Sequence, residues 1–180
     1  VGQYTAGGDE AGNFLEEGES QGGAAVNPEL LEYGTKAAQI TEYYITDEAG
    51  IRTTAIIKGQ QFTIHLKVEF SEDVPAPIFA FTVKNVKGTE ITGTNTMVEK
   101  AFLKSVQAGE RKEVTFSQRM SLQGGEYLLS FGVTGYERDT FQVYHRLYDA
   151  VNLTVISDKD TVGYYDMNTT ITVVDGNEVG

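Results

Sequence analysis

The sequence predicts an all-β protein in which two antiparallel sheets pack as a sandwich. Apolar and polar side chains alternate with a period of two over residues 62–70, and residues 127–133 repeat this alternation. Clusters of turn-forming residues separate the short apolar runs, and no window of helical length carries an apolar stripe at helical spacing. Short strands with turns at this spacing are typical of an antiparallel sandwich.

The expected strands follow one another along the chain with turns between them. In residues 62–70 an apolar side chain occupies every second position from Phe62 to Phe70, so this strand turns one face to a core. In chain order, the strand-like runs are residues 39–46, 62–70, 77–84, 90–95, 113–122, 127–133, 141–156 and 169–174. Turn signals lie at residues 47–50, 85–88, 108–110 and 123–125. We expect an immunoglobulin-like topology, with the run 141–156 interrupted near Tyr148 and Asp149.

The negative charge of the chain is concentrated at its N-terminal end. The 180 residues carry 26 acidic and 14 basic side chains, a net charge of −12. Seven of the acidic residues and seven glycines lie within residues 1–32, which contain no lysine or arginine. Such a segment cannot bury enough apolar surface to offset the entropy lost on folding. We therefore expect an acidic, glycine-rich flexible linker over residues 1–32 and a β-sandwich domain over residues 33–180.

Composition and motifs argue against several classes of function. An acidic chain disfavours a nucleic-acid partner, and no apolar run reaches the roughly 20 residues of a membrane-spanning helix. The chain has no cysteine nucleophile, no P-loop and no G-x-S-x-G motif. Residues 157–160 and Asp166 carry oxygen ligands suited to calcium, but their spacing differs from that of an EF-hand, and we interpret the segment as a solvated turn. We expect no catalytic residue, no metal and no cofactor.

Several polar and aromatic residues are candidates for binding a hydroxyl-rich ligand. Aromatic faces beside hydrogen-bonding groups suit a glycan, because its C–H faces stack while its hydroxyls need partners. The alternative for each residue is that it packs within the fold, since tyrosine is common in strands. The cationic members also predict that the ligand carries an anionic group such as phosphate or uronate. The candidates are His65, Lys67, Ser130, Tyr144, His145, Arg146 and Tyr148.

A set of short motifs gives the chain a resemblance to a known family. The motifs are Tyr33-Gly34-Thr35, the turn at residues 47–50, Gly93-Thr94-Asn95-Thr96, the run 122–127 and Tyr148-Asp149-Ala150. Over residues 33–174 the chain resembles the Wzt C-terminal domain family, the carbohydrate-recognition domains of the ATPase subunits of bacterial polysaccharide ABC transporters. Gly93 to Thr96 suits a bulge or tight turn, and we interpret this motif as architectural rather than ligand-binding.

The resemblance implies a function and a set of partners. It implies a non-catalytic module that binds a bacterial surface polysaccharide, O-antigen-like and recognised at its terminal part, for export by an ABC transporter. The implied partners are the transporter's nucleotide-binding domain and membrane subunit, and a second copy of the chain with which the strand at residues 169–174 is exchanged. The implied location is cytoplasmic, at the inner face of the membrane, without membrane insertion, and residues 1–32 would tether the ATPase.

Two other functions remain open on the sequence alone. A structural or adhesion domain of a secreted or surface protein would share the sandwich, the acidity and the absence of cysteine. A β-sandwich glycosidase or lyase would need two carboxylates facing a cleft, and the sequence marks no such pair.

Overall fold

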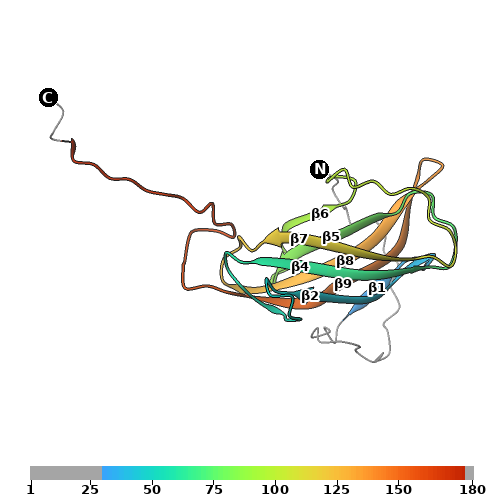
Figure 1. Ribbon diagram of the computed structural model, residues 1–180, viewed down its shortest axis with the longest axis horizontal. Helices are drawn as coiled ribbons and strands as arrows, with labels where there is room; N and C mark the ends of the chain where they lie inside the picture. Colours follow the sequence, from blue (N-terminus) through green and yellow to red (C-terminus); the bar gives the residue numbers. More distant parts are fainter. Residues whose placement is uncertain (1–29, 177–180) are drawn as a thin grey trace.

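The computed structural model describes residues 30–176 and consists of two β-sheets packed face to face (Figure 1). The larger sheet has six strands, which are, in spatial order, β1 (Leu31–Tyr33), β9 (Thr140–Ile156), β8 (Gly125–Glu137), β5 (Ile78–Asn85) and β6 (Glu90–Asn95), with β3 (Ala55–Ile57) paired in parallel to the end of β9. The smaller sheet contains β2 (Ala38–Thr46), β4 (Gln61–Phe70) and β7 (Arg111–Arg119) in that order. All other ladders are antiparallel, and no helix crosses or covers the sheets among the described residues. The predicted all-β sandwich is confirmed.

The core lies between the two sheets and follows the alternation in the sequence. In β4, buried and partly exposed positions alternate over the whole strand, and Ile64, Leu66 and Val68 are almost completely buried. Leu129 and Val133 of β8 meet them from the larger sheet within one continuous core. Each such fully buried side chain stabilises the fold by about 1.5–3 kcal/mol relative to exposure to water.

Strand β9 is continuous but irregular. Its pairing with β8 shifts register twice, between Leu129 and Phe131 and between Val133 and Thr134. Asp149 has a positive φ of 52°, which places it in the left-handed region. The interruption predicted near Tyr148 and Asp149 is therefore a bulge within one strand, not a break between two strands.

The two ends of the domain differ from the sequence-based expectations. Leu31 and Glu32, assigned to the linker by composition, lie in β1, and the rest of the expected linker lies outside the described residues. Residues 169–174, expected to be the last strand, form no ladder and run away from the sandwich (Figure 1). Ile171 and Val173 are 81% and 86% exposed. A strand needs a hydrogen-bonded neighbour, and this segment has none within the described part of a single chain.

The described residues contain no helix long and apolar enough to cross a membrane. They also contain no cluster of three or more His, Cys, Asp or Glu side chains that could hold a metal ion.

Asp166, the calcium-ligand candidate, is instead paired with two lysines: Lys58 Nζ lies 3.0 Å and Lys159 Nζ 2.8 Å from its Oδ2. The hydrogen bond from Lys159, the backbone N–H of Asn168 and the bond from Lys58 hold the pKa of Asp166 well below its usual range.

Candidate functional site

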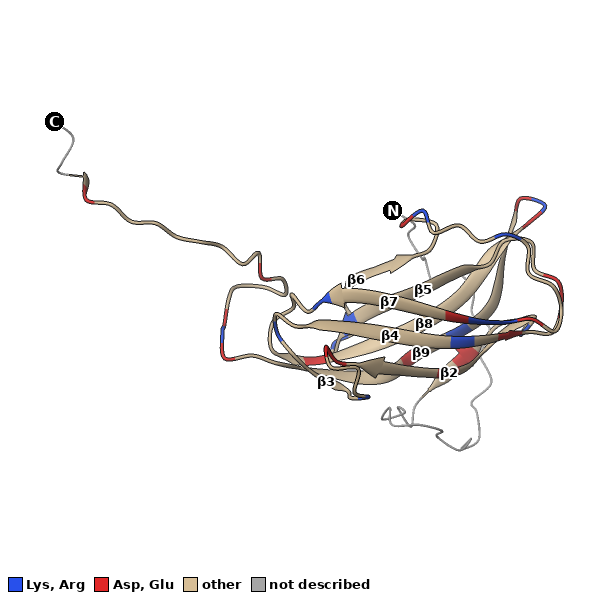
Figure 2. Cartoon of the chain, viewed as in Figure 1, with Lys and Arg blue, Asp and Glu red and all other residues tan. Residues whose placement is uncertain are grey.

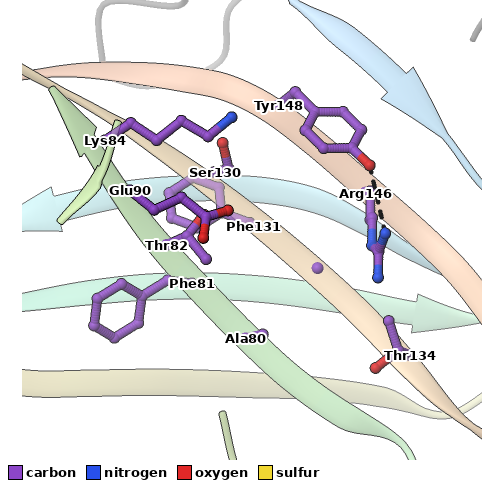
Figure 3. A pocket seen from close by; sticks show the side chains of 11 residues that line it. Ala80, Phe81, Thr82, Lys84, Glu90, Ser130, Phe131, Thr134, Arg146 and Tyr148 are labelled. Carbon is purple, nitrogen blue, oxygen red and sulfur yellow. Dashed lines mark hydrogen bonds between the residues drawn. The ribbon is translucent and has the colours of Figure 1, made fainter. Parts of the chain in front are cut away.

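A pocket of about 140 Å³ lies on the outer face of the larger sheet, where β5, β6, β8 and β9 run side by side. Phe81, Leu129 and Phe131 of these strands belong to the core, so the residues next to them in each strand face outward. Figure 3 shows the side chains around this outer pocket. The outer pocket is lined by Ala80, Phe81, Thr82, Lys84, Glu90, Ser130, Phe131, Gly132, Thr134, Arg146 and Tyr148.

Small residues form the floor of the outer pocket and longer ones surround it. Ala80 and Gly132 are cross-strand partners on β5 and β8, and neither carries a long side chain that could fill the hollow. Gly132 is also opposite Arg146 on β9. Thr82, Lys84 and Glu90 therefore lie on one side of a shallow floor, and Arg146 and Tyr148 lie on the other (Figure 3).

The groups around the outer pocket form a connected polar network. Arg146 Nη1 is 3.5 Å from the hydroxyl oxygen of Tyr148. Lys84 Nζ lies 5.8 Å from the centre of the Tyr148 ring and 3.8 Å from Oδ1 of Asp149. The Asp149 N–H donates to Ser130 Oγ at 2.8 Å, so β8 fixes the bulge that follows Tyr148. Two cations, one lining carboxylate, an aromatic ring and several hydroxyls can together bind a small, hydroxyl-rich ligand.

Three of the seven residues proposed from the sequence line the outer pocket: Ser130, Arg146 and Tyr148. His65 and Lys67 lie on β4, on the outer face of the other sheet, and do not take part. The His65 ring stacks on Tyr44 with centroids 4.4 Å apart, and its Nε2 lies 2.8 Å from Thr46 Oγ1. Lys67 Nζ lies 2.9 Å from Glu42 Oε2, which raises the pKa of Lys67 and lowers that of Glu42.

The remaining two candidates, Tyr144 and His145, are only 2% and 1% exposed, which corrects the expectation that they join an exposed cluster. The Tyr144 hydroxyl donates to Glu137 Oε1 at 3.0 Å. Burial raises the pKa of Tyr144 most, and the nearby carboxylate of Glu137 raises it further. His145 Nδ1 accepts the N–H of Ile40 at 2.8 Å, and its Nε2 contacts Glu32 Oε1. The register shift next to these residues buries two consecutive side chains, which a strict period of two does not predict.

Sequence reasoning missed several residues of the outer pocket. Lys84, Glu90 and Gly132 belong to strands that the sequence does predict, but none of them was among its candidates. Their outward positions could be derived from the alternation, but their proximity depends on the order of strands in the sheet. No local signal in the sequence states that β5 lies between β6 and β8.

A second hollow, of about 550 Å³, lies at the end of the sandwich where the C-terminal segment begins. Of its charged residues, Lys58 and Lys159 both pair with Asp166, as described above, and Arg119 donates to the carbonyl of Gly59. Exposed Met167 also lines it. This hollow anchors the connection that leads to residues 169–174, whereas the outer pocket offers more varied groups to a ligand.

Comparisons with known proteins agree with this architecture. The model of the family described as Wzt C-terminal domain matches residues 30–167. A crystal structure of the C-terminal domain of wzt aligns with a TM-score of 0.77 and 28% identity, covering 84% of this chain and 92% of that one. A CARDB domain from Pyrococcus furiosus aligns with a TM-score of 0.38 and 15% identity over 69% of this chain and 93% of that one, a likeness too weak to support an argument. No curated protein matches the sequence.

Proposed function

Because this chain belongs to the Wzt C-terminal domain family, we propose that it binds carbohydrate and that the outer pocket is its binding site. Membership of the family implies a non-catalytic carbohydrate-binding role in a polysaccharide ABC transporter. The observation that carries the assignment of the site is the arrangement of Tyr148, Arg146 and Lys84 around a floor of small residues. A sugar ring can lie against Tyr148 while its hydroxyls meet the charged groups.

We propose that the ligand is the terminal part of a bacterial surface polysaccharide of the O-antigen type. The outer pocket is smaller than the roughly 300–1,000 Å³ of sites for drug-sized ligands, so it suits one sugar unit better than a run of several. Lys84 and Arg146 also support the expectation of an anionic substituent on that sugar. A neutralised form of the glycan would then bind more weakly than the native form.

The geometry gives no support to hydrolysis of the glycan. Canonical glycoside hydrolysis uses two carboxyl groups flanking the bond. Among the described residues that line the outer pocket, Glu90 is the only one with a carboxylate. The adhesion alternative has no specific observation in its favour.

We further propose that two copies of the chain exchange residues 169–174, and three observations support this. Residues 167–174 carry no charge and are rich in β-branched side chains, as the uniformly tan segment in Figure 2 shows. Such a composition favours a strand over a solvated tail. Asp166 fixes the start of the segment, and Asn168 turns it outward with a φ of 57°. Finally, β7 has only β4 beside it in the described structure, so its other edge can accept a strand.

In the transporter, the proposed partners are the nucleotide-binding domain and the membrane subunit, at the cytoplasmic face of the membrane. Residues 1–32 would then include the tether between the ATPase and this domain. This placement follows from the role of the family and from the order of segments in the chain.

Calorimetric titration with the surface polysaccharide purified from the bacterium that carries the gene tests the binding site. Tyr148→Ala and Arg146→Ala should each weaken binding about tenfold or more, because stacking and charge-assisted hydrogen bonds of this kind contribute roughly 1–3 kcal/mol. His65→Ala, on the opposite sheet, is the matched control and should bind like the unaltered chain. If the folded domain does not bind, or if both pocket variants bind normally, the proposal is wrong.

A further inference from the structure

One of the shortest described strands, β1, pairs with a strand that lines the outer pocket. Strand β1 runs along β9 at the edge of the larger sheet (Figure 1). Its three residues pair with the part of β9 that supplies two side chains of the pocket. The pairs are Leu31 with Tyr148, Glu32 with Leu147, and Tyr33 with Arg146.

This part of β9, residues 145–148, is held less regularly by β8 on its other side. Between the two register shifts, β8 and β9 share only three pairs, namely Phe131 with Leu147, Gly132 with Arg146, and Val133 with His145. The shifts on both sides of these pairs disrupt the regular ladder at each end of the segment. This short segment of β9 therefore has only three pairs with β8 on one edge, and its other edge pairs with β1.

One buried contact fastens β1 to this segment. Glu32 of β1 and His145 of β9 are 6% and 1% exposed, and the carboxylate contacts Nε2 of the imidazole. Because Nδ1 accepts the N–H of Ile40, the imidazole proton lies on Nε2 and is donated to Glu32. The same ring thus joins β1, β9 and, through Ile40, the smaller sheet. Lys36 adds an ion pair, with its Nζ 3.3 Å from Glu32 Oε1.

The chain that follows β1 continues along β9 without a gap. The N–H of Thr35 donates to the carbonyl of Val143 at 3.2 Å, and that of Lys36 donates to the carbonyl of Tyr144 at 2.7 Å. At Gly34 the two backbones are so close that a Cβ would collide with the Tyr144 carbonyl. Residues 31–36 consequently form one strip against residues 143–148 of β9.

The energetics make this strip depend on its buried contact. A strand of three residues forms few ladder hydrogen bonds, and each of them contributes little net stability. Replacing Glu32 by alanine, by contrast, leaves the Nε2–H of His145 buried without its acceptor, which is strongly unfavourable. Loss of the contact between Glu32 and His145 would therefore favour release of β1 from β9.

We propose that Glu32 and His145 are positioning residues: they dock β1 on β9 and thereby hold Arg146 and Tyr148 in the geometry that binds carbohydrate. This inference rests on the proposed function of the outer pocket. Binding of the glycan and docking of β1 are then coupled, and the coupling acts equally in both directions. Since β1 directly follows residues 1–30 in the sequence, occupancy of the pocket changes how firmly the start of the domain is held.

Hydrogen exchange in the absence of ligand tests the positioning directly. In Glu32→Ala the amides among residues 146–148 that donate to β1 should exchange about tenfold or more faster, because they lose their hydrogen-bond acceptors on that strand. The amides of Ile64 to Val68 in β4 should not change. Glu42→Ala is the matched control, since it removes an ion-paired carboxylate on the smaller sheet. Glu32→Gln, which keeps the acceptor for His145, supplies a milder variant if Glu32→Ala does not fold.

Binding then tests the coupling, with the surface polysaccharide of the bacterium that carries the gene as the probe. Glu32→Ala and Glu32→Gln should bind more weakly, by about tenfold for the alanine variant, although Glu32 does not line the pocket. Saturating polysaccharide should in turn slow amide exchange at residues 32 and 33 of the unaltered chain. Normal binding by a folded Glu32→Ala variant whose β1 exchanges rapidly would overturn the inference and leave the proposed function intact. If the unaltered chain does not bind, the proposed function is wrong. Unchanged amide exchange at residues 146–148 in Glu32→Ala would by itself overturn the positioning role of Glu32.

Discussion

His65 and His145 show how differently two residues of one type can be placed in this fold. His65 lies on an outer sheet face, where it stacks on Tyr44, and Arg52 Cζ lies 3.7 Å from the centre of the Tyr44 ring. The ring of Tyr44 is thus covered by neighbouring side chains and cannot stack on a sugar. His145 lies in the interior, fixed by hydrogen-bond partners on both nitrogens. Both residues were equal candidates in the sequence, and the difference arises from burial alone.

Burial of His145 predicts that the domain loses stability when the pH falls below about 6.5, the ordinary pKa of histidine. Desolvation lowers the pKa of His145 in the folded state, an effect that Glu32 opposes and Lys36 reinforces. Below the ordinary pKa the unfolded chain therefore binds more protons than the folded chain, so the free energy of unfolding decreases. Urea unfolding at pH 7.5 and 5.5 should show a loss of up to about 1.4 kcal/mol from this residue.

Two variants assign that loss. His145→Gln should flatten the pH dependence between these two values. His65→Gln should retain most of it, although burial also lowers the pKa of His65 to some extent. An unchanged pH dependence in His145→Gln would show that another group is responsible.

Gly34 predicts a second effect at the scale of single residues. Its φ of 130° favours glycine, and an added Cβ would collide with the backbone of Tyr144 and His145. Gly34→Ala should reduce the free energy of unfolding by about 2 kcal/mol or more, since strain and displacement of backbone add to each other. Gly50→Ala, at a φ of 79° with open space around the new methyl group, should cost only about 1 kcal/mol. Chemical unfolding of both variants measures the difference, and equal losses would contradict the steric argument.

At the scale of elements, the period of two predicts the long regular strands and fails where pairing becomes irregular. Strand β4 follows the expected alternation from end to end, because one of its faces meets the core and the other meets water. In β9 the irregular pairing buries two consecutive residues, so the burial of Tyr144 and His145 was not predicted. Strands β1 and β3 have three residues each, too few for any period to be recognised. Their existence depends on contacts with distant parts of β9.

The same irregularity explains why only part of the candidate site could be predicted. Ser130 lies on a strand whose alternation turns it away from the core, whereas Tyr148 lies beside the bulge of β9 and was a candidate through its residue type alone. Lys84 reaches them only because β5 pairs with β8, which is a property of the topology. A single sequence shows which residues share a face of a strand, but it does not show the order in which the strands pair.

The bulge in β9 predicts an effect of a residue on another strand. Ser130 Oγ of β8 accepts the N–H of Asp149, and Ser130→Ala would leave this partly buried donor without its partner. We expect a loss of about 1–2 kcal/mol in the free energy of unfolding. Ser117→Ala is the matched control, because its hydroxyl bonds to that of Thr63 at an exposed position, and it should change stability by no more than about 0.5 kcal/mol. Urea unfolding compares the two, and a neutral Ser130→Ala would show that water replaces the hydroxyl.

At the scale of the whole molecule, the described sandwich carries acidic and basic residues close to one another. Acidic and basic residues are interspersed over both sheets in Figure 2, and several form pairs, such as Arg111 with Glu69. The β-sandwich is therefore much closer to neutrality than the net charge of −12 suggests, since residues 1–32 hold seven acidic side chains and no basic ones. A charged sugar can approach the sandwich without strong repulsion from the chain as a whole.

The uncharged C-terminal segment predicts the oligomeric state of the molecule. Left in water, residues 169–174 would expose Ile171, Val173 and Val174 almost fully. Pairing with the free edge of β7 in a second copy would bury these side chains and satisfy backbone groups on both strands.

We therefore expect the full chain to be a dimer in sedimentation experiments at micromolar concentration. A chain truncated after Asn168 should be a monomer that retains the outer pocket, because no residue of the segment lines that pocket. Ile171→Asp combined with Val173→Asp should have the same effect without shortening the chain, whereas Glu126→Ala, which alters an exposed residue at the start of β8, should leave the dimer unchanged. A truncated chain that still sediments as a dimer would place the interface elsewhere, and a full chain that remains monomeric would rule out the exchange.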